Sequence, residues 1–255
     1  MNLTLRDKNA VITGGARGIG AACAQVLAAE GAKVILIDVD QDGLAATEKK
    51  IQAQGGKVIS CPVDITKRDL VKQTLNRLEE DCGNIHILVN NAARVTTMAR
   101  LTNLADDLWD GDIEINLTGS FNLTKIAFES MKKDGWGRIV FISSLAGIMG
   151  GFAQSSYAAS KMGLVGLARS VALEGGKHGI TANVIAPGII GTETVQRHVS
   201  KEALESVAKL TAMGRPGNPE DVANLAAFLC SEQAGYITGE VIPVAGGLDL
   251  LVLPL

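Results

Sequence analysis

The chain has 255 residues and a formal net charge of −3, and apolar residues make up 47% of it while charged residues make up 20%. This composition supplies enough apolar side chains for a large core and excludes an intrinsically disordered chain. Lysine and arginine are scattered without a basic excess, so we expect no nucleic-acid partner and no binding to a membrane surface.

The sequence also predicts the compartment and the state of the cysteines. No apolar stretch reaches the ~18 residues of a membrane span, and Arg6, Asp7 and Lys8 stand where a signal peptide would have its apolar core. We therefore expect a cytoplasmic protein. The four cysteines are too few and too widely spaced for a disulfide scaffold and are interpreted as reduced thiols. The three histidines do not cluster with other ligand types, so we predict no metal site.

Seven short runs of apolar and β-branched residues predict strands, at residues 9–13, 33–37, 57–60, 86–90, 138–143, 181–186 and 240–244. Most lack alternation, as is typical of a parallel sheet covered on both faces. Helical periodicity begins at Ile19 and recurs at 41–53, 67–80, 106–131, 156–174 and 219–231. This order predicts one α/β domain over residues 1–255, a doubly wound Rossmann fold with a seven-stranded parallel sheet flanked by helices.

The segment at residues 188–213 is the exception to this alternation. It is long, lies before the last helix and has helical periodicity near 201–210. Long insertions of this kind are often functional, and we interpret this one as a lid over the substrate.

A glycine-rich segment, TGGARGIG at residues 13–20, joins the first strand to the first helix. In that context its backbone N–H groups can approach a pyrophosphate at the positive end of the helix, although a plain glycine-rich turn has the same composition. Gly14, Gly18 and Gly20 follow the pattern GxxxGxG rather than GxGxxG. With this motif the chain resembles the compact, single-domain members of the short-chain dehydrogenase/reductase family.

Asp38 directly follows the second predicted strand, 18 residues after Gly20. A carboxylate there accepts hydrogen bonds from the adenosine ribose hydroxyls and repels a 2′-phosphate. Arg17 argues the other way, because a guanidinium beside the glycines could pair with that phosphate. Since Asp38 both repels a phosphate and fails to attract one, we expect NAD rather than NADP as the cofactor.

Tyr157 and Lys161 are four residues apart and share one face of a predicted helix, a pattern that also occurs in exposed helices. Ser144 lies 13 residues before the tyrosine, which matches the family spacing of the catalytic serine and tyrosine and leaves Ser143 as a supporting group. A free phenol has a pKa near 10, and we expect the ammonium of Lys161 to lower it. Tyr157 would then exchange a proton with the substrate oxygen, which Ser144 would bind.

The resemblance implies further site residues. It assigns Asn116, an odd polar residue within a predicted helix, to a proton-relay water beside the lysine. Asp64 would contact adenine, unless it caps a helix. Ala93 departs from the glycine that the family usually has after Asn-Asn-Ala, and Ala245 departs from its usual aspartate. The implied cofactor contacts are Gly14, Arg17, Gly18, Ile19, Gly20, Asp38, Asp64, Ile65, Asn90, Ala92, Tyr157, Lys161, Pro187, Gly188, Ile190 and Thr192.

Three functions fit these residues. The first is an NAD(H)-dependent oxidoreductase that interconverts a secondary alcohol and a ketone. The alternative within the family is an NADPH-dependent 3-oxoacyl-carrier-protein reductase. A different class is a non-catalytic sensor that binds the dinucleotide. The segments 93–104 and 189–213 mix apolar residues with arginines, which favours an apolar or amphipathic ketone.

The resemblance also implies a homotetramer or a homodimer, assembled through the two long helices predicted at 106–131 and 156–174. Small and apolar residues recur along one side of the second helix, which suits close helix contact and is equally explained by core packing. These residues are Ala158, Met162, Val165, Ala168 and Ala172.

Overall fold

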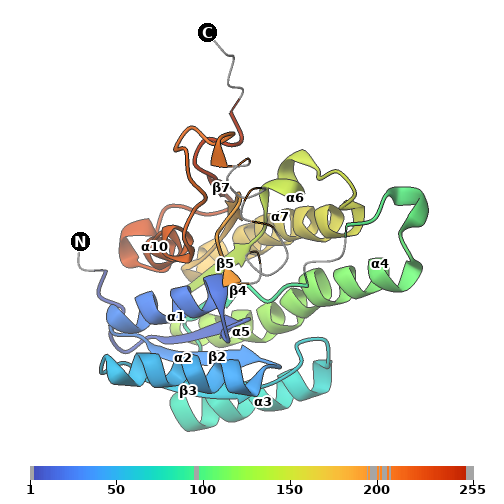
Figure 1. Cartoon of the computed structure of the whole chain (residues 1–255). Helices are drawn as coiled ribbons and strands as arrows, with labels where there is room; N and C mark the ends of the chain where they lie inside the picture. The colour runs from blue at the N-terminus through green and yellow to red at the C-terminus, as the bar shows by residue number, and fades with distance from the viewer. Residues whose placement is uncertain are drawn as a thin grey trace.

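The structure is a computed structural model, and it describes residues 3–94, 98–193, 195, 200, 202, 206 and 208–250. A seven-stranded parallel sheet with the order β3-β2-β1-β4-β5-β6-β7 forms its centre (Figure 1). The strands are β1 (Asn9–Thr13), β2 (Lys33–Asp38), β3 (Lys57–Pro62), β4 (Ile87–Asn90), β5 (Gly137–Ile142), β6 (Ile180–Pro187) and β7 (Val241–Val244). The predicted doubly wound Rossmann fold and its seven strands are confirmed, with ends that differ by at most two residues.

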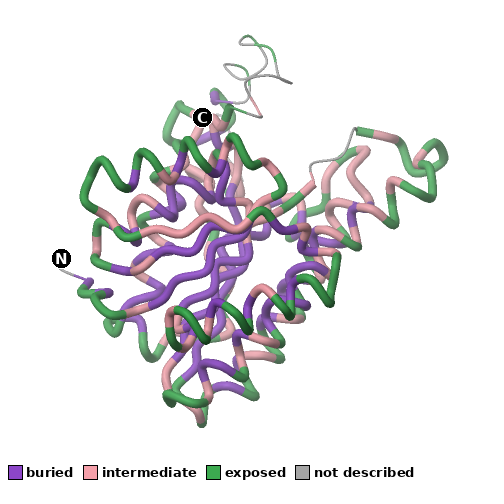
Figure 2. Tube along the Cα trace, turned by 90° about the horizontal axis from the view of Figure 1, so that it is seen from below, coloured by how far each residue is buried: buried purple, intermediate pink, exposed green. Residues whose placement is uncertain are grey.

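Helices cover both faces of the sheet because successive strand residues point to opposite sides. Ile12 of β1 packs into the core beneath α1 (Gly18–Ala29), α2 (Gln41–Ala53) and α10 (Pro219–Leu229). Val11 packs into the core beneath α3 (Arg68–Cys82), α5 (Ser120–Asp134) and α7 (Ser155–Gly175). Figure 2 shows the buried strands between helices whose outward sides are exposed. Both faces are therefore closed, which leaves the ends of the strands as the place for a site.

The remaining helices of the described ranges are short. They are η1 (Leu101–Asn103), α4 (Asp106–Asp112), η2 (Ile113–Gly119), α6 (Leu145–Met149), η3 (Gly176–His178) and η4 (Glu232–Ala234). No helix in the described ranges is long and apolar enough to cross a membrane. The four cysteines are free thiols, of which Cys23 and Cys230 are fully buried and the other two half-buried.

The helix predicted at 106–131 is confirmed as an uninterrupted helical stretch over Asp106–Asp134, and its middle, η2, is π-helical and lies between α4 and α5. A Cβ atom at Gly119 would lie 2.6 Å from Cδ1 of Ile65, so this glycine allows a close approach at the end of η2. The Ser120 hydroxyl donates to the Asn116 carbonyl at 2.9 Å and supports the wide turn. Such π-turns are frequent at functional sites.

Of the two explanations left open for the small and apolar residues along α7, core packing holds for three of them. Val165, Ala168 and Ala172 are buried in the core of this chain, while Met162 is exposed. The outward side of α7 lies about a quarter turn away, and core packing therefore explains the pattern of small residues.

Candidate active site

One cleft at the carboxyl ends of the strands brings together most of the predicted site residues. Its walls come from the segments that follow β1, β2, β4, β5 and β6 and from α7. The predicted residues that line it are Gly14, Arg17, Gly18, Ile19, Asp38, Ala92, Ser144, Tyr157, Lys161, Pro187, Gly188, Ile190 and Thr192. The residues that line it and were not predicted as cofactor contacts are Val39, Asp40, Asn91, Ala93, Ile142, Ser143 and Val195.

The glycine-rich turn leaves the start of α1 open to an anion. Gly14 and Gly18 have φ values of +66° and +57°, a region that glycine adopts without strain. Arg17 stands at the N-cap without a side-chain hydrogen bond to the helix, and the first turn carries no acidic residue. The N–H groups at this helix end therefore suit the pyrophosphate of a dinucleotide, and this cradle is the structural reason to expect such a cofactor.

Asn91 supports this cradle, and sequence reasoning missed it. Its Nδ2 atom donates to the carbonyl oxygens of Thr13 and Gly14 at 2.9 and 3.2 Å. A Cβ atom at Gly14 would lie 2.6 Å from the same Nδ2 atom. Asn90, predicted as a cofactor contact, is buried and donates to the Thr124 hydroxyl at 3.0 Å, so it belongs to the scaffold and does not line the cleft.

Asp38 lies in the cleft where its carboxylate is held by the backbone. Its Oδ2 atom accepts from the Ala16 N–H at 3.2 Å, and its Oδ1 atom accepts from the Asp40 N–H at 3.1 Å. The Arg17 guanidinium is paired with the Asp40 carboxylate. The Gly43 N–H, which Asp40 caps, is the largest cause that lowers the pKa of Asp40, and Arg17 also lowers it. Arg17 is therefore engaged with a carboxylate and not presented alone to a phosphate.

Asp64 and Ile65 do not line the cleft, although the resemblance assigns them to the cofactor. The Asp64 carboxylate accepts from the N–H and the hydroxyl of Thr66 at 2.9 and 2.8 Å, so it forms a turn before α3. Ile65 is buried and packs against Gly119. The N-cap of α3 is Lys67, so Asp64 makes a local turn before the helix and does not cap it.

Ser144, Tyr157 and Lys161 meet at one end of the cleft. Ser144 ends the loop after β5 and caps α6, where its Oγ atom accepts from the Ala146 N–H at 3.1 Å. The Lys161 side chain is 2% exposed, and its Nζ atom lies 5.8 Å from the centre of the Tyr157 ring and donates to the Ile142 carbonyl at 2.8 Å. Tyrosine and lysine thus face the same pocket from successive turns of α7.

The electrostatics of this trio differ from the sequence prediction. Burial is the largest cause of the raised pKa of Tyr157, while its hydrogen bond with Ser144 lowers the pKa and the charge of Asp112 raises it. Burial also lowers the pKa of Lys161 to about 8. The net pKa of Tyr157 is therefore raised because desolvation dominates, and the lowering effect of the Lys161 charge stays a prediction.

Ser143 and Asn116 hold the surroundings of the trio. The Ser143 hydroxyl donates to the Lys161 carbonyl at 2.8 Å, as expected of a supporting group. Asn116 is fully buried, its Oδ1 atom accepts from the Arg94 N–H at 2.7 Å, and its Nδ2 atom donates to the Arg94 carbonyl at 3.2 Å and to the Ser160 hydroxyl at 3.0 Å. The side chain of Asn116 therefore ties the loop after β4 to α7.

The start and end of the predicted lid, residues 188–213, are anchored to neighbouring backbone. The Gly191 N–H donates to the Gly217 carbonyl at 2.8 Å, and the Met213 N–H donates to the Gly246 carbonyl at 3.1 Å. Residues 194, 196–199, 201, 203–205 and 207 lie outside the described residues, and so does most of the helical periodicity predicted at 201–210.

An exposed apolar rim includes the end of α6, the helix whose N-cap is Ser144. It combines residues 98–101 with residues 148–152, which lie side by side because the Ala99 N–H donates to the Ala153 carbonyl at 2.9 Å. Arg100 lies over the ring of Phe152 at 5.7 Å. The exposed apolar members of this rim are Met98, Leu101, Ile148, Met149 and Phe152.

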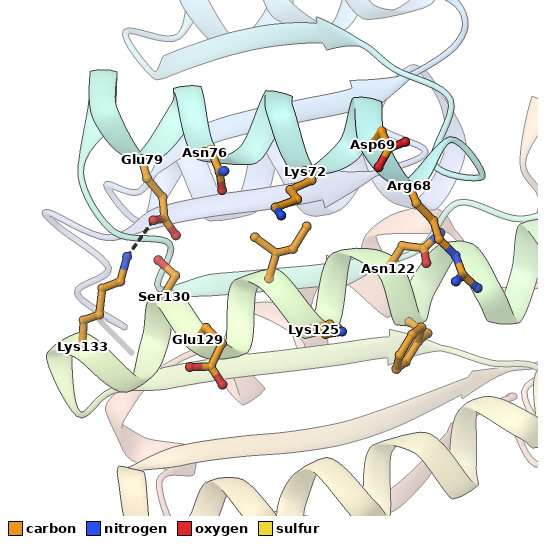
Figure 3. A pocket seen from close by; sticks show the side chains of 12 residues that line it. Arg68, Asp69, Lys72, Asn76, Glu79, Asn122, Lys125, Glu129, Ser130 and Lys133 are labelled. Carbon is orange, nitrogen blue, oxygen red and sulfur yellow. Dashed lines mark hydrogen bonds and ion pairs between the residues drawn. The ribbon is translucent and has the colours of Figure 1, made fainter.

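A second pocket lies between α3 and α5 and contains none of the predicted site residues (Figure 3). Charged side chains of both signs line it, including Lys72 and Lys125, and an ion pair of 2.8 Å joins Lys133 to Glu79 at one end. Its mixed charge shows no preference for one kind of ligand.

Known proteins resemble this chain along nearly its full length. Residues 14–249 match the family described as enoyl-(acyl carrier protein) reductase. The 3-oxoacyl-[acyl-carrier-protein] reductase of Escherichia coli is 38% identical over 98% of this chain and 100% of its own length. The enzyme of the same name from Thermotoga maritima is 37% identical over 96% of this chain and 99% of its own.

A solved structure from Agrobacterium tumefaciens, provisionally named a gluconate dehydrogenase, has a TM-score of 0.94 and 30% sequence identity, covering 99% of this chain and 100% of its own. Its likeness agrees with the fold described above. The chain is an oxidoreductase that acts on alcohol or ketone groups with a nicotinamide dinucleotide, and it belongs to the short-chain dehydrogenase/reductase family.

Proposed function

We propose that this protein reduces the ketone of a 3-oxoacyl thioester to the secondary alcohol, with NADH as the reductant. The observation that carries the substrate class is the similarity to two 3-oxoacyl-[acyl-carrier-protein] reductases at 37% and 38% identity over almost the entire chain. The residues alone favour a simple secondary alcohol and its ketone, and the named relatives favour the 3-oxoacyl alternative.

Tyr157 is the proton donor in this proposal. The bound nicotinamide would supply the hydride to the carbonyl carbon. The Tyr157 hydroxyl protonates the carbonyl oxygen, and Ser144, to which it is hydrogen-bonded, binds that oxygen and holds it in line. The raised pKa of Tyr157 suits this direction because it keeps the phenol protonated before the reaction.

Lys161 places a fixed positive charge at the same end of the cleft. Its buried Nζ atom is fixed by the Ile142 carbonyl at 2.8 Å, so it cannot swing away from the tyrosine without losing that hydrogen bond. With a pKa of about 8, the ammonium is largely protonated at neutral pH. It then favours the phenolate that Tyr157 becomes after it has given up its proton.

The cofactor preference rests on two carboxylates at the end of β2. Asp38 is positioned by two backbone N–H groups, and Asp40 neutralises the cation of Arg17. A 2′-phosphate at this end of the cleft would meet negative charge without an unpaired cation beside it, whereas two ribose hydroxyls could donate to Asp38. NADH is therefore the cofactor that this site favours.

The exposed apolar rim supports a substrate with an acyl chain. Phe152, Leu101 and Met149 are 76%, 74% and 62% exposed, and such side chains beside a polar cleft suit an apolar group that leaves water on binding. Arg100 lies in the same rim and adds a positive charge near its edge. An acyl thioester with a negatively charged carrier matches this combination.

A homotetramer or homodimer stays part of the proposal, with a revised contact face. The outward side of α7 exposes Ala159, Met162, Gly166 and Leu173 at helical spacing. Open space surrounds Gly166, so nothing within the described chain requires a glycine at this position of the helix. Close approach of a second α7 helix would account for it.

The experiment compares substrates and cofactors in one panel. Acetoacetyl-coenzyme A, simple secondary alcohols with their ketones, and gluconate are assayed with NADH or NADPH. The proposal predicts the highest kcat/KM for acetoacetyl-coenzyme A with NADH. A higher kcat/KM for a simple alcohol or for gluconate would reject the thioester, and a clear preference for NADPH would reject the role given to Asp38.

A further inference from the structure

Asp112 is a buried carboxylate that the proposed reaction does not use. It is the last residue of α4, its side chain is 0% exposed, and the neighbouring acidic residues of that helix, Asp106, Asp107 and Asp110, are exposed. Burying a carboxylate costs free energy because it loses its hydration. An apolar side chain at this position would stabilise the fold more, if packing were its only role. Its position therefore needs another explanation.

One partner of Asp112 belongs to the reacting helix. The Ser156 hydroxyl, itself 2% exposed, donates to Oδ2 of Asp112 at 2.7 Å. Ser156 directly precedes Tyr157 in the first turn of α7. The carboxylate thus ties the end of α4 to the turn that carries the tyrosine.

The other charges around Tyr157 are few within the described residues. Lys161 lies on the next turn of α7, and Arg17, Asp38 and Asp40 line the same cleft from the segments after β1 and β2. Arg94 comes from the loop after β4, and its guanidinium lies against Gly111, one residue before Asp112. Ser144, on the side of α6, is neutral. Asp112 is thus the buried negative charge on the α4 side of the tyrosine.

We infer that Asp112 is a positioning residue that acts through Ser156 and Tyr157: its hydrogen bond fixes the start of α7, and its buried negative charge opposes loss of the Tyr157 proton. The raised pKa of Tyr157, to which Asp112 contributes after burial, agrees with this. The inference rests on the proposed role of Tyr157 as the proton donor.

An absorbance titration tests the charge effect without any turnover. The chain has two tyrosines, and Tyr236 is fully exposed, so the variant Tyr236→Phe leaves the ultraviolet signal of tyrosinate to Tyr157. In this background, Asp112→Asn removes the charge and keeps an oxygen that can accept from Ser156. Far-UV circular dichroism across the same pH range verifies that the protein stays folded.

The expected result is that Tyr157 loses its proton at a lower pH in Asp112→Asn than in the parent. Asp110→Asn is the matched control, because it removes the same charge from the exposed side of the same helix and is expected to change nothing. An unchanged or higher titration midpoint in Asp112→Asn would overturn the charge effect. If that variant does not fold, the double variant Asp112→Val/Ser156→Ala replaces the whole polar pair and carries the same expectation.

Kinetics test the positioning effect and separate it from the proposed function. Ser156→Ala keeps the charge and removes the hydrogen bond, and it is expected to lower kcat for ketone reduction while KM for the cofactor stays the same. An unchanged kcat would overturn the positioning role. If Tyr157→Phe turns over at the parent rate, the proposed function fails, whereas an inactive Tyr157→Phe beside an unshifted Asp112→Asn rejects only the inference on Asp112.

Discussion

The Nζ atom of Lys161 donates to the carbonyl oxygen of Ile142 at 2.8 Å, and this hydrogen bond fixes a buried cation at the carboxyl end of β5. Ile142 is followed by Ser143 and Ser144, so one strand end supplies the anchor of the lysine and the serine that is hydrogen-bonded to Tyr157. The site is thereby organised by two elements, β5 and α7, before any ligand is bound.

Lys161→Met is expected to make the protein more stable at neutral pH. Burial lowers the pKa of Lys161 from 10.5 to about 8, so the unfolded chain binds more protons between these values. The folded protein carries the full penalty of the buried ammonium below pH 8 and loses it as the pH rises toward 10.5. Removing the ammonium should therefore raise the free energy of unfolding by roughly 3 kcal/mol. Loss of the hydrogen bond to the Ile142 carbonyl should offset about 1 kcal/mol of this gain.

Urea unfolding at pH 7 and pH 10 measures this effect. The gain of Lys161→Met should be about 2 kcal/mol at the lower pH and should shrink or reverse at the higher one. Lys177→Met, which replaces an exposed lysine on η3, is the control for the change in chain composition. Equal stabilities of Lys161→Met and the parent at both pH values would argue against a buried ammonium.

Asn116→Ala is expected to lower both stability and activity. The substitution leaves the Arg94 N–H and carbonyl and the Ser160 hydroxyl without their side-chain partner. Unpaired buried groups cost about 1–3 kcal/mol, and the loop after β4 would lose its tie to α7. Thermal unfolding and kcat are the measurements. Asn103→Ala, at an exposed position, should stay within about 0.5 kcal/mol of the parent.

Asp38→Ser is expected to shift the cofactor preference toward NADPH. The substitution removes the carboxylate that would repel a 2′-phosphate, and like charges placed together in a binding site cost several kcal/mol. The ratio of kcat/KM for NADPH to that for NADH should rise by about 10- to 100-fold. Asp42→Ser, on the exposed side of α2, is the matched control and should leave the ratio unchanged. An unaltered ratio in Asp38→Ser would mean that the preference is set elsewhere.

Gly166→Arg is expected to dissociate the proposed assembly without harming the subunit. Open space surrounds Gly166 within one chain, and replacing glycine in a helix favours that helix by up to about 1 kcal/mol. Light scattering should give a smaller molar mass, while the far-UV circular dichroism spectrum stays the same. Ala45→Arg, at an exposed position of α2, should keep the parent mass. An unchanged mass in Gly166→Arg would remove α7 from the interface.

The fold and most of the cleft could be predicted from the sequence because they depend on local patterns. The apolar runs of β2 and β5 are long enough to be recognised as strands from the sequence alone. Gly14, Ser144 and Tyr157 follow strands or lie near the start of helices, at spacings that the motif predicts. The π-helical segment η2 within the long helix could not be predicted, because it depends on the packing of Gly119 against Ile65, a contact between distant segments.

Three details of the site also depend on tertiary contacts. Asn90 and Asn91 are adjacent, and only the strand register decides which one faces the cleft. The direction of the pKa of Tyr157 follows from burial, which residue identity does not reveal. Asp112 stands in a sequence rich in acidic residues, and nothing in that pattern distinguishes the one that is buried.

Tyr157→Phe tests the central claim most directly, through kcat for ketone reduction measured beside the affinity for NADH. Phenylalanine keeps the ring and removes only the hydroxyl that carries the proton. We predict an unchanged affinity for NADH and a kcat lower by at least about 100-fold. A variant that turns over at close to the parent rate would contradict the assignment of Tyr157 as the proton donor.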